Sequence, residues 1–158
     1  MNNNNSENRV EIQIKIERPP NWAELRNRFK FPEATTIFAY GDCIYNPGGV
    51  PLEPHVILHE MVHMEQQRKT SPEEWYKRYM EEPDFLISQE AEAYQKQFEY
   101  IKSIIKDRNR QARILHELAS FFASSMYGKP LGYGEAIQMI KYRKHDKELV
   151  WISLGEAR

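Results

Sequence analysis

The 158-residue sequence has a single cysteine, no long apolar segment and almost no net charge. Cys43 alone cannot form a disulfide within the chain, which is typical of a protein in a reducing compartment. No segment approaches the roughly 18 apolar residues that a membrane-spanning helix needs, and the opening MNNNNSENR lacks the apolar core of a signal peptide. We therefore expect a cytoplasmic protein with no membrane association.

Positive and negative charges are nearly equal in number, with 22 Lys and Arg against 23 Asp and Glu. A net charge of −1 gives no overall field that would attract nucleic acid. A basic cluster over residues 141–147 is expected to face solvent at the end of a helix. We therefore expect no nucleic-acid partner, and nothing in the sequence indicates an oligomeric state.

The first part of the sequence has the pattern of a small sheet. Residues 1–9 are polar and rich in Asn, and we expect a disordered tail ahead of a single domain over residues 10–158. Apolar and polar residues alternate over residues 10–17, which predicts a half-buried strand. Residues 35–40 and 43–45 predict two further strands, and Gly41-Asp42 between them predicts a hairpin.

The rest of the sequence has the apolar spacing and the capping residues of helices. We predict helices over about residues 22–30, 54–69, 72–81, 85–107, 110–127 and 135–142. Asn21 followed by Glu24 resembles a capping box, and Ser71 is a second cap. This order predicts an α+β fold in which a small antiparallel sheet precedes a helical half.

The most informative segment is His59-Glu60-Met61-Val62-His63, which matches the pattern H-E-x-x-H. Residues four apart on a helix lie on one face, so both imidazoles can bind one zinc ion. Zinc lowers the pKa of a bound water toward neutrality, and Glu60 between the ligands can accept its proton. The motif therefore predicts a zinc-dependent hydrolase.

A catalytic zinc ion needs a third protein ligand from elsewhere in the chain. His55 lies four residues before His59, but three histidines spaced in this way span about 12 Å along a helix, too far for one ion. On the long predicted helix, Glu90 lies about 60° from Ile87, at the edge of the apolar stripe, whereas Glu92 lies on the far side. A carboxylate that faces the core needs a partner, so we expect Glu90 as the third ligand, with Glu92 as the alternative.

The zinc motif with a downstream Glu resembles the gluzincin branch of zinc metallopeptidases. Gln66 and Lys69 stand where a metzincin has Gly and His, which excludes that class. The segment Gln89–Tyr94 is similar to the second gluzincin motif, in which an acid four residues after the ligand orients a histidine. Tyr94 holds that position here, and it is our candidate for a hydrogen bond to a ligand histidine.

The layout over about residues 35–142 also resembles small, single-domain metallopeptidases encoded in phage genomes. The shared features are a hairpin and a Pro-Gly loop before the zinc motif, an E-x-E-A-Y segment after it, and a final helix after a Tyr-Gly turn. This resemblance implies a minimal zincin-like domain that hydrolyses peptide bonds, in the host cytoplasm if the chain is encoded by a phage.

Two hypotheses for the function are consistent with these motifs. In the first, the protein is a zinc metallopeptidase acting on a peptide or protein: His59, His63 and Glu90 hold Zn²⁺, and Glu60 is the general base. Tyr127 or Tyr133, in a predicted loop, would then donate a hydrogen bond to the developing oxyanion. In the second, the protein binds zinc without turnover and has a structural or partner-binding role.

Overall fold

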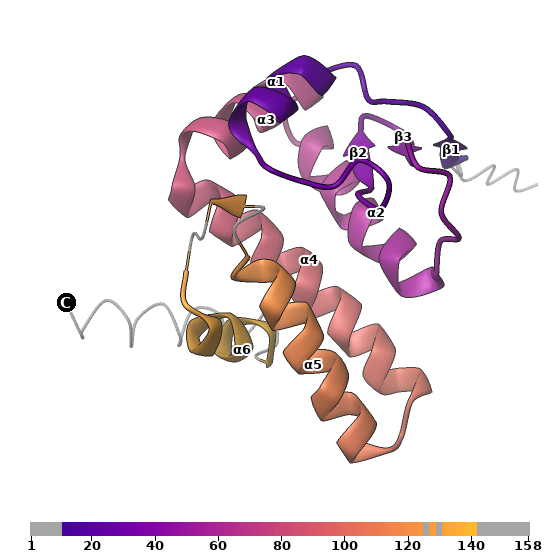
Figure 1. Cartoon of the computed structure of the whole chain (residues 1–158), viewed down its shortest axis with the longest axis vertical. Coiled ribbons are helices and arrows are strands. Elements are labelled where there is room, and N and C mark those ends of the chain that lie inside the picture. Colours follow the sequence, from indigo (N-terminus) through magenta and orange to yellow (C-terminus); the bar gives the residue numbers. More distant parts are fainter. Residues whose placement is uncertain (1–10, 125–126, 129–130, 142–158) are drawn as a thin grey trace, which may run out of the picture.

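The computed structural model describes residues 11–124, 127–128 and 131–141. Within them the chain forms β1 (Gln13–Lys15), α1 (Trp22–Arg28), β2 (Phe38–Tyr40), β3 (Cys43–Tyr45), α2 (Pro54–Arg68), α3 (Pro72–Glu81), α4 (Pro83–Ile104), α5 (Arg108–Phe122) and α6 (Tyr133–Lys141). Figure 1 shows the sheet with α1 to α3 in one half of the molecule and α4 to α6 in the other. The α+β class is therefore confirmed, while the expected tail over residues 1–9 lies outside the described residues.

The sheet is mixed, so the expected antiparallel sheet is only partly correct. β2 and β3 form the predicted antiparallel hairpin around Gly41. β1 instead pairs in parallel with β3, giving the order β1-β3-β2. The chain between β1 and β3 contains α1 and β2. It is long enough for β3 to lie beside β1 and run in the same direction.

The expected burial of the first strand is also wrong, since Ile14 and Ile16 are 48% and 75% exposed. β1 lies at the edge of the sheet, and the strands that α2 packs against are mainly β2 and β3. The helix therefore covers Ala39 and Ile44 through Met64 and leaves the outer strand largely open to solvent.

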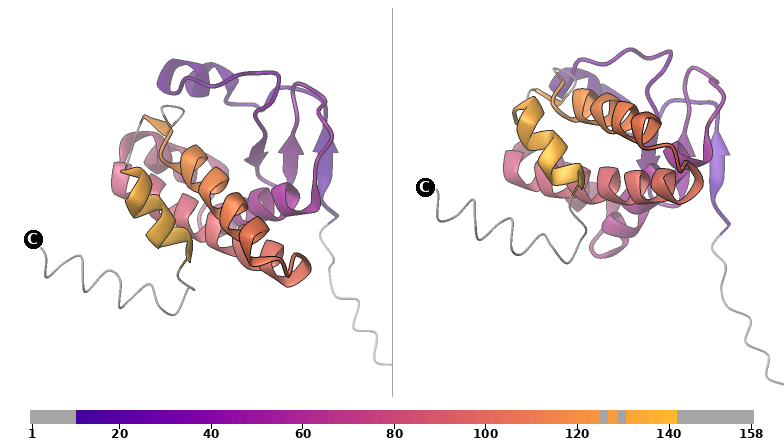
Figure 2. Two further views of the ribbon diagram at one scale, coloured as in Figure 1. Left: turned by 60° about the horizontal axis from the view of Figure 1, so that its bottom comes forward. Right: turned by 90° about the horizontal axis from the view of Figure 1, so that it is seen from below.

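Two further clusters complete the core on either side of α4, which contacts α2, α3, α5 and α6. One is rich in aromatic side chains from α1, α3 and the hairpin, including Phe29, Phe38 and Trp75. The other is formed by side chains of α4, α5 and α6, including Phe122 and Ile140, and Figure 2 shows these three helices together. Helix α4 is therefore the element that joins the two halves.

Buried polar side chains attach the hairpin to α2 and α3. The amide of Gln67 donates to the carbonyl of Ala39 at 2.9 Å and accepts from the backbone N–H of Gly41 at 2.8 Å. The hydroxyl of Tyr76 donates to the same Ala39 carbonyl at 2.6 Å. These contacts fix β2 beside the helix that carries the H-E-x-x-H motif.

The helix caps differ in how well the sequence predicted them. The backbone N–H of Glu74 donates to Ser71 Oγ at 3.1 Å, as expected for the cap of α3. Asn21 makes no side-chain hydrogen bond to α1, because its φ and ψ of −95° and 26° are not the extended geometry that a capping box needs. Within the described ranges, each helix falls short of the length or the apolar character that a membrane crossing requires.

We predict that Gly48→Ala destabilises the fold. A Cβ atom at Gly48 would lie 1.9 Å from the carbonyl oxygen of Ala34, so the loop before α2 would have to move. The expected loss is about 2 kcal/mol in the free energy of unfolding, measured by urea denaturation. Gly134→Ala in α6 is the control, because nothing lies within 4 Å of its added Cβ. Equal stability of the two variants would contradict this close approach.

Candidate metal centre

Helix α2 brings His59 and His63 together because they stand one turn apart on its buried face. The imidazole of His59 is 9% exposed and that of His63 is 6% exposed. Their Nε2 atoms lie 3.2 Å apart, and the planes of the two rings are 79° from parallel. The Nε2 atoms of the two rings therefore lie close enough to bind one ion.

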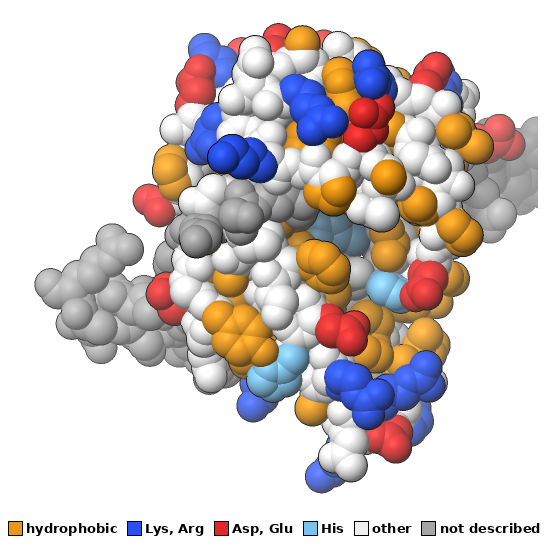
Figure 3. All heavy atoms as spheres, in the orientation of Figure 1, with side chains coloured by type: hydrophobic (Ala, Val, Ile, Leu, Met, Phe, Trp, Pro, Cys, Tyr) orange, Lys and Arg blue, Asp and Glu red, His pale blue; other side chains and the backbone are white. Residues whose placement is uncertain are grey.

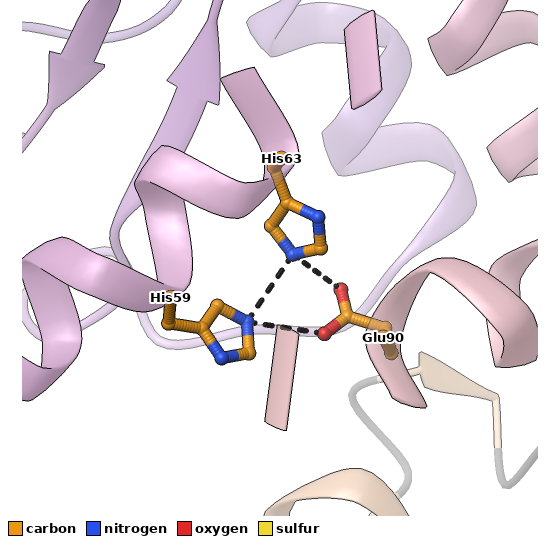
Figure 4. Close-up of side chains that lie close together, drawn as sticks. All are labelled: His59, His63 and Glu90. Atoms are coloured by element: carbon orange, nitrogen blue, oxygen red, sulfur yellow. Dashed lines mark hydrogen bonds and ion pairs between the residues drawn. The ribbon is translucent and has the colours of Figure 1, made fainter. Parts of the chain in front are cut away.

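Glu90 of α4 completes the group, as expected from its position on the helix. Its carboxylate oxygens lie 3.2 Å from His59 Nε2 and 3.1 Å from His63 Nε2, as Figure 4 shows. No other set of three or more His, Cys, Asp or Glu in the described part of the chain has this geometry. The expected alternative, Glu92, accepts a hydrogen bond from Gln66 instead.

The spacing of these atoms fits a small cation. A zinc ion about 2.0–2.1 Å from each ligand atom, in tetrahedral geometry, separates those atoms by about 3.3 Å. The two Nε2 atoms are 3.2 Å apart, and each lies 3.1 to 3.2 Å from a different oxygen of Glu90. In addition, the buried Oε2 atom of Glu90 has no hydrogen-bond partner among the described residues, and its neighbour at 3.2 Å is the ring nitrogen of His59. An orphaned buried carboxylate oxygen is costly unless a cation neutralises it, so the residues present fit a metal ion.

The hydrogen bonds of His63 determine which of its nitrogens is free for a metal. Gln66 Nε2 donates to the carbonyl of Gln89 at 3.0 Å, which fixes the orientation of that amide. Gln66 Oε1 must then accept from His63 Nδ1–H, at 2.8 Å. In the neutral imidazole, His63 Nε2 therefore carries a lone pair that points toward Glu90 and His59.

His59 has an equivalent support from α4. Its Nδ1 lies 2.9 Å from Gln97 Oε1. The other end of this amide, Gln97 Nε2, lies 2.8 Å from His55 Nδ1, and His55 Nε2 lies 2.5 Å from Glu53 Oε2. His55 is thus an indirect support of the centre and not a member of the metal-binding group, in agreement with the expectation from helix length.

The acid–base properties of the centre depend on burial and on the contact between Glu90 and the imidazoles. Burial would raise the pKa of Glu90, but the adjacent His63 and His59 hold it far below its usual range. Burial lowers the pKa of His63, but the charge of Glu90 and the hydrogen bond to it raise this pKa more, to about 9. In the metal-free chain a proton on His63 Nε2 therefore occupies the place of a metal ion.

Glu60 lies beside the three ligating groups and is not one of them. It is 8% exposed, and it lines both the small hollow that contains the three ligating groups and a larger cleft beside it. Burial raises the pKa of its carboxyl group, while His59, His63 and a backbone hydrogen bond from Ala39 partly oppose that shift. A carboxylate with a raised pKa next to a metal site is suited to accept a proton.

The three tyrosines that the sequence suggested as supporting or oxyanion-binding residues lie in different surroundings. Tyr94 packs its ring against His59 at 4.6 Å, but its hydroxyl lies 3.0 Å from that of Tyr127, so the expected hydrogen bond to a ligand histidine is wrong. Tyr127 lines both hollows beside Glu60. Tyr133 is 43% exposed and its hydroxyl contacts His116, so it does not belong to the centre.

Several supports of the ligands were not predicted from the sequence. Gln66 and Gln97 bind the imidazoles, and the hydroxyl of Tyr79 donates to Glu90 Oε1 at 2.6 Å. Gln66 comes three residues after His63, and Gln97 comes seven after Glu90, so each shares a helix face with a ligand. These spacings could have indicated the two glutamines. Tyr79 contacts Glu90 from another helix, α3, so no spacing along one helix relates the two residues.

Comparison with protein-family models, curated proteins and solved structures finds no match to this chain. A function for the chain must therefore be inferred from the geometry of the centre itself.

We predict that the protein binds about one zinc ion per chain and that Glu90→Ala weakens binding by about 100-fold or more, because it removes a ligand. Glu92→Ala is the control on the same helix. It removes an acceptor of Gln66 but no member of the metal-binding group, and should cost about tenfold or less. Chelator competition on protein shown by circular dichroism to be folded measures both values. A larger effect of Glu92→Ala would show that the ligand has been misassigned.

We also predict that zinc binding at pH 7 releases about one proton, because the pKa of His63 is about 9 without metal and the ion must displace that proton. Zinc affinity should consequently rise between pH 7 and pH 9 and then level off. Calorimetric titration in buffers of different ionisation enthalpy measures the released protons. A binding heat independent of the buffer at pH 7 would contradict a charged His63.

Proposed function

We propose that the protein is a zinc-dependent peptidase with a minimal zincin-like fold. The observation that carries the proposal is the convergence of His59, His63 and Glu90 at a spacing that fits zinc, with a buried fourth group, Glu60, that is not one of the ligands. A purely structural zinc site has no use for such a carboxylate. A bound zinc ion would supply Lewis acidity, which activates water and polarises a peptide carbonyl.

Glu60 performs the proton transfers in this proposal. Its carboxylate takes a proton from the attacking water as the new C–O bond forms, and it holds that proton in the buried site. It then gives the proton to the amine nitrogen as the C–N bond breaks. The pKa of Glu60, raised by burial, favours its holding the proton between these two steps.

Tyr127 is the candidate donor to the carbonyl oxygen of the substrate. Burial, followed by the negative charge of Glu90, raises the pKa values of both Tyr94 and Tyr127, so both keep their protons. If Tyr94 donates to the oxygen of Tyr127, the proton of Tyr127 is left for the substrate. Tyr94 then orients the donor rather than a ligand histidine.

The test of this function is Glu60→Gln, which keeps the size and polarity of the side chain and removes the base. We expect hydrolysis of peptides from a broad library to fall by about 100-fold or more, while zinc content and melting temperature stay near those of the wild type. Mass spectrometry of the digests, metal analysis and calorimetry provide these measurements.

A Glu60→Gln variant as active as the wild type would exclude Glu60 as the base. A wild-type protein that binds zinc but cleaves no library peptide would instead support the second hypothesis, a zinc-binding protein without turnover.

A further inference from the structure

A large cleft opens beside the metal centre. It has a volume of about 810 Å³ and runs from His59 and Glu60 between the start of α2, the loop over residues 30–37 and the helices α4 and α5. In the orientation of Figure 3 the hollow faces the viewer, with apolar side chains on its walls and histidine surface on its floor. The cleft is thus continuous with the groups that would carry out the reaction.

The walls of this cleft are mainly aliphatic. They include Ile37 and Val56 on one side, and Ile101, Ile104, Ile105, Ile114, Leu118 and Phe121 on the side of α4 and α5. Ile104 is 59% exposed and Phe121 is 58% exposed, so two large apolar side chains of the cleft wall are open to solvent. A ligand that covers them gains from removing this surface from water.

The charged residues of the cleft do not favour a ligand of either sign. Away from Glu60 at the metal centre, Lys30 and Arg110 are matched by Glu53 and Glu117, and Glu53 is in contact with His55. A charged ligand side chain would therefore lose hydration without entering a field of opposite sign. The chemistry of the cleft consequently fits an uncharged, apolar side chain.

A second, much smaller hollow holds the metal centre itself, since His59, His63 and Glu90 all line it. It has a volume of about 80 Å³ and is walled by rings that include Phe29, Trp75 and Tyr79. It shares His59 and Glu60 with the large cleft, so the large cleft opens onto the metal centre. A metal ion would occupy the small hollow, so the side chains of a bound ligand lie in the large cleft.

From this cleft we infer the substrate class: a peptide with a large apolar side chain next to the reacting bond. That side chain lies against Ile104 and Phe121. The cleavage part of this inference rests on the proposed peptidase function, whereas the binding preference does not.

The binding preference is tested on the full-length Glu60→Gln chain, with and without zinc chloride. Blocked tetrapeptides Ac-Ala-Ala-X-Ala-NH2, with X as Leu, Phe, Ala, Asp or Lys, are titrated while amide chemical shifts are followed by NMR. The Leu and Phe peptides should bind at least tenfold more tightly than the Asp and Lys peptides and shift amides around residues 104 and 121. Equal affinities, or no shifts from any peptide at millimolar concentration, would overturn the inference.

Substitutions in the wall connect this preference to the cleft. Phe121→Ser should reduce the advantage of the Leu and Phe peptides at least fivefold, and Ile104→Ser should act in the same direction. Ile16→Ser is the matched control, because Ile16 is 75% exposed and does not line the cleft. Melting temperatures verify that each variant is folded. If both cleft variants keep the full preference for the Leu and Phe peptides, the apolar subsite lies elsewhere.

Cleavage maps from the wild-type chain separate this inference from the peptidase proposal. Cuts next to a large apolar residue support both, and cuts without such a preference overturn only the substrate class. If peptides bind with the expected preference but none is cut, the binding inference stands and the peptidase proposal fails.

Discussion

The structure depends on the meeting of three electron-rich groups in a buried space between α2 and α4. The nitrogens of His59 and His63 and the carboxylate of Glu90 approach within 3.1 to 3.2 Å. Such an arrangement is unfavourable unless protons or a metal cation lie between the lone pairs. In the metal-free chain a proton on His63 fulfils this need, and the same nitrogen is a ligand when a metal replaces the proton.

The surroundings of the centre hold its ligands in place without adding competing charge. Glutamine side chains, rather than carboxylates, accept the Nδ1–H of each ligand imidazole, through Gln66 and Gln97. A neutral acceptor fixes the orientation of the ring but adds no negative charge, so Glu90 is the negatively charged member of the metal-binding group. The hairpin is fixed to α2 through Gln67, which keeps Glu60 in the lining of both the small hollow and the large cleft.

The elements that could be predicted from the sequence are those determined by local patterns. The hairpin is indicated by Gly41-Asp42, the start of α3 by Ser71, and the helix of the zinc motif by its apolar flanks and Pro54. The pairing of β1 was not predictable in the same way. Parallel pairing joins residues about 30 positions apart, and the alternation of residues 10–17 is compatible with either direction of pairing.

The sequence by itself determined that His59 and His63 share one helix face and that Glu90 lies at the edge of another buried stripe, because helical periodicity is a local property. The tertiary structure alone decided that these two faces meet, that Tyr94 bonds Tyr127 and that Tyr133 lies elsewhere. Those outcomes depend on how α4 packs against α2, α3, α5 and α6. Such packing is set by the fit of many side chains far apart in the chain, which no local pattern contains.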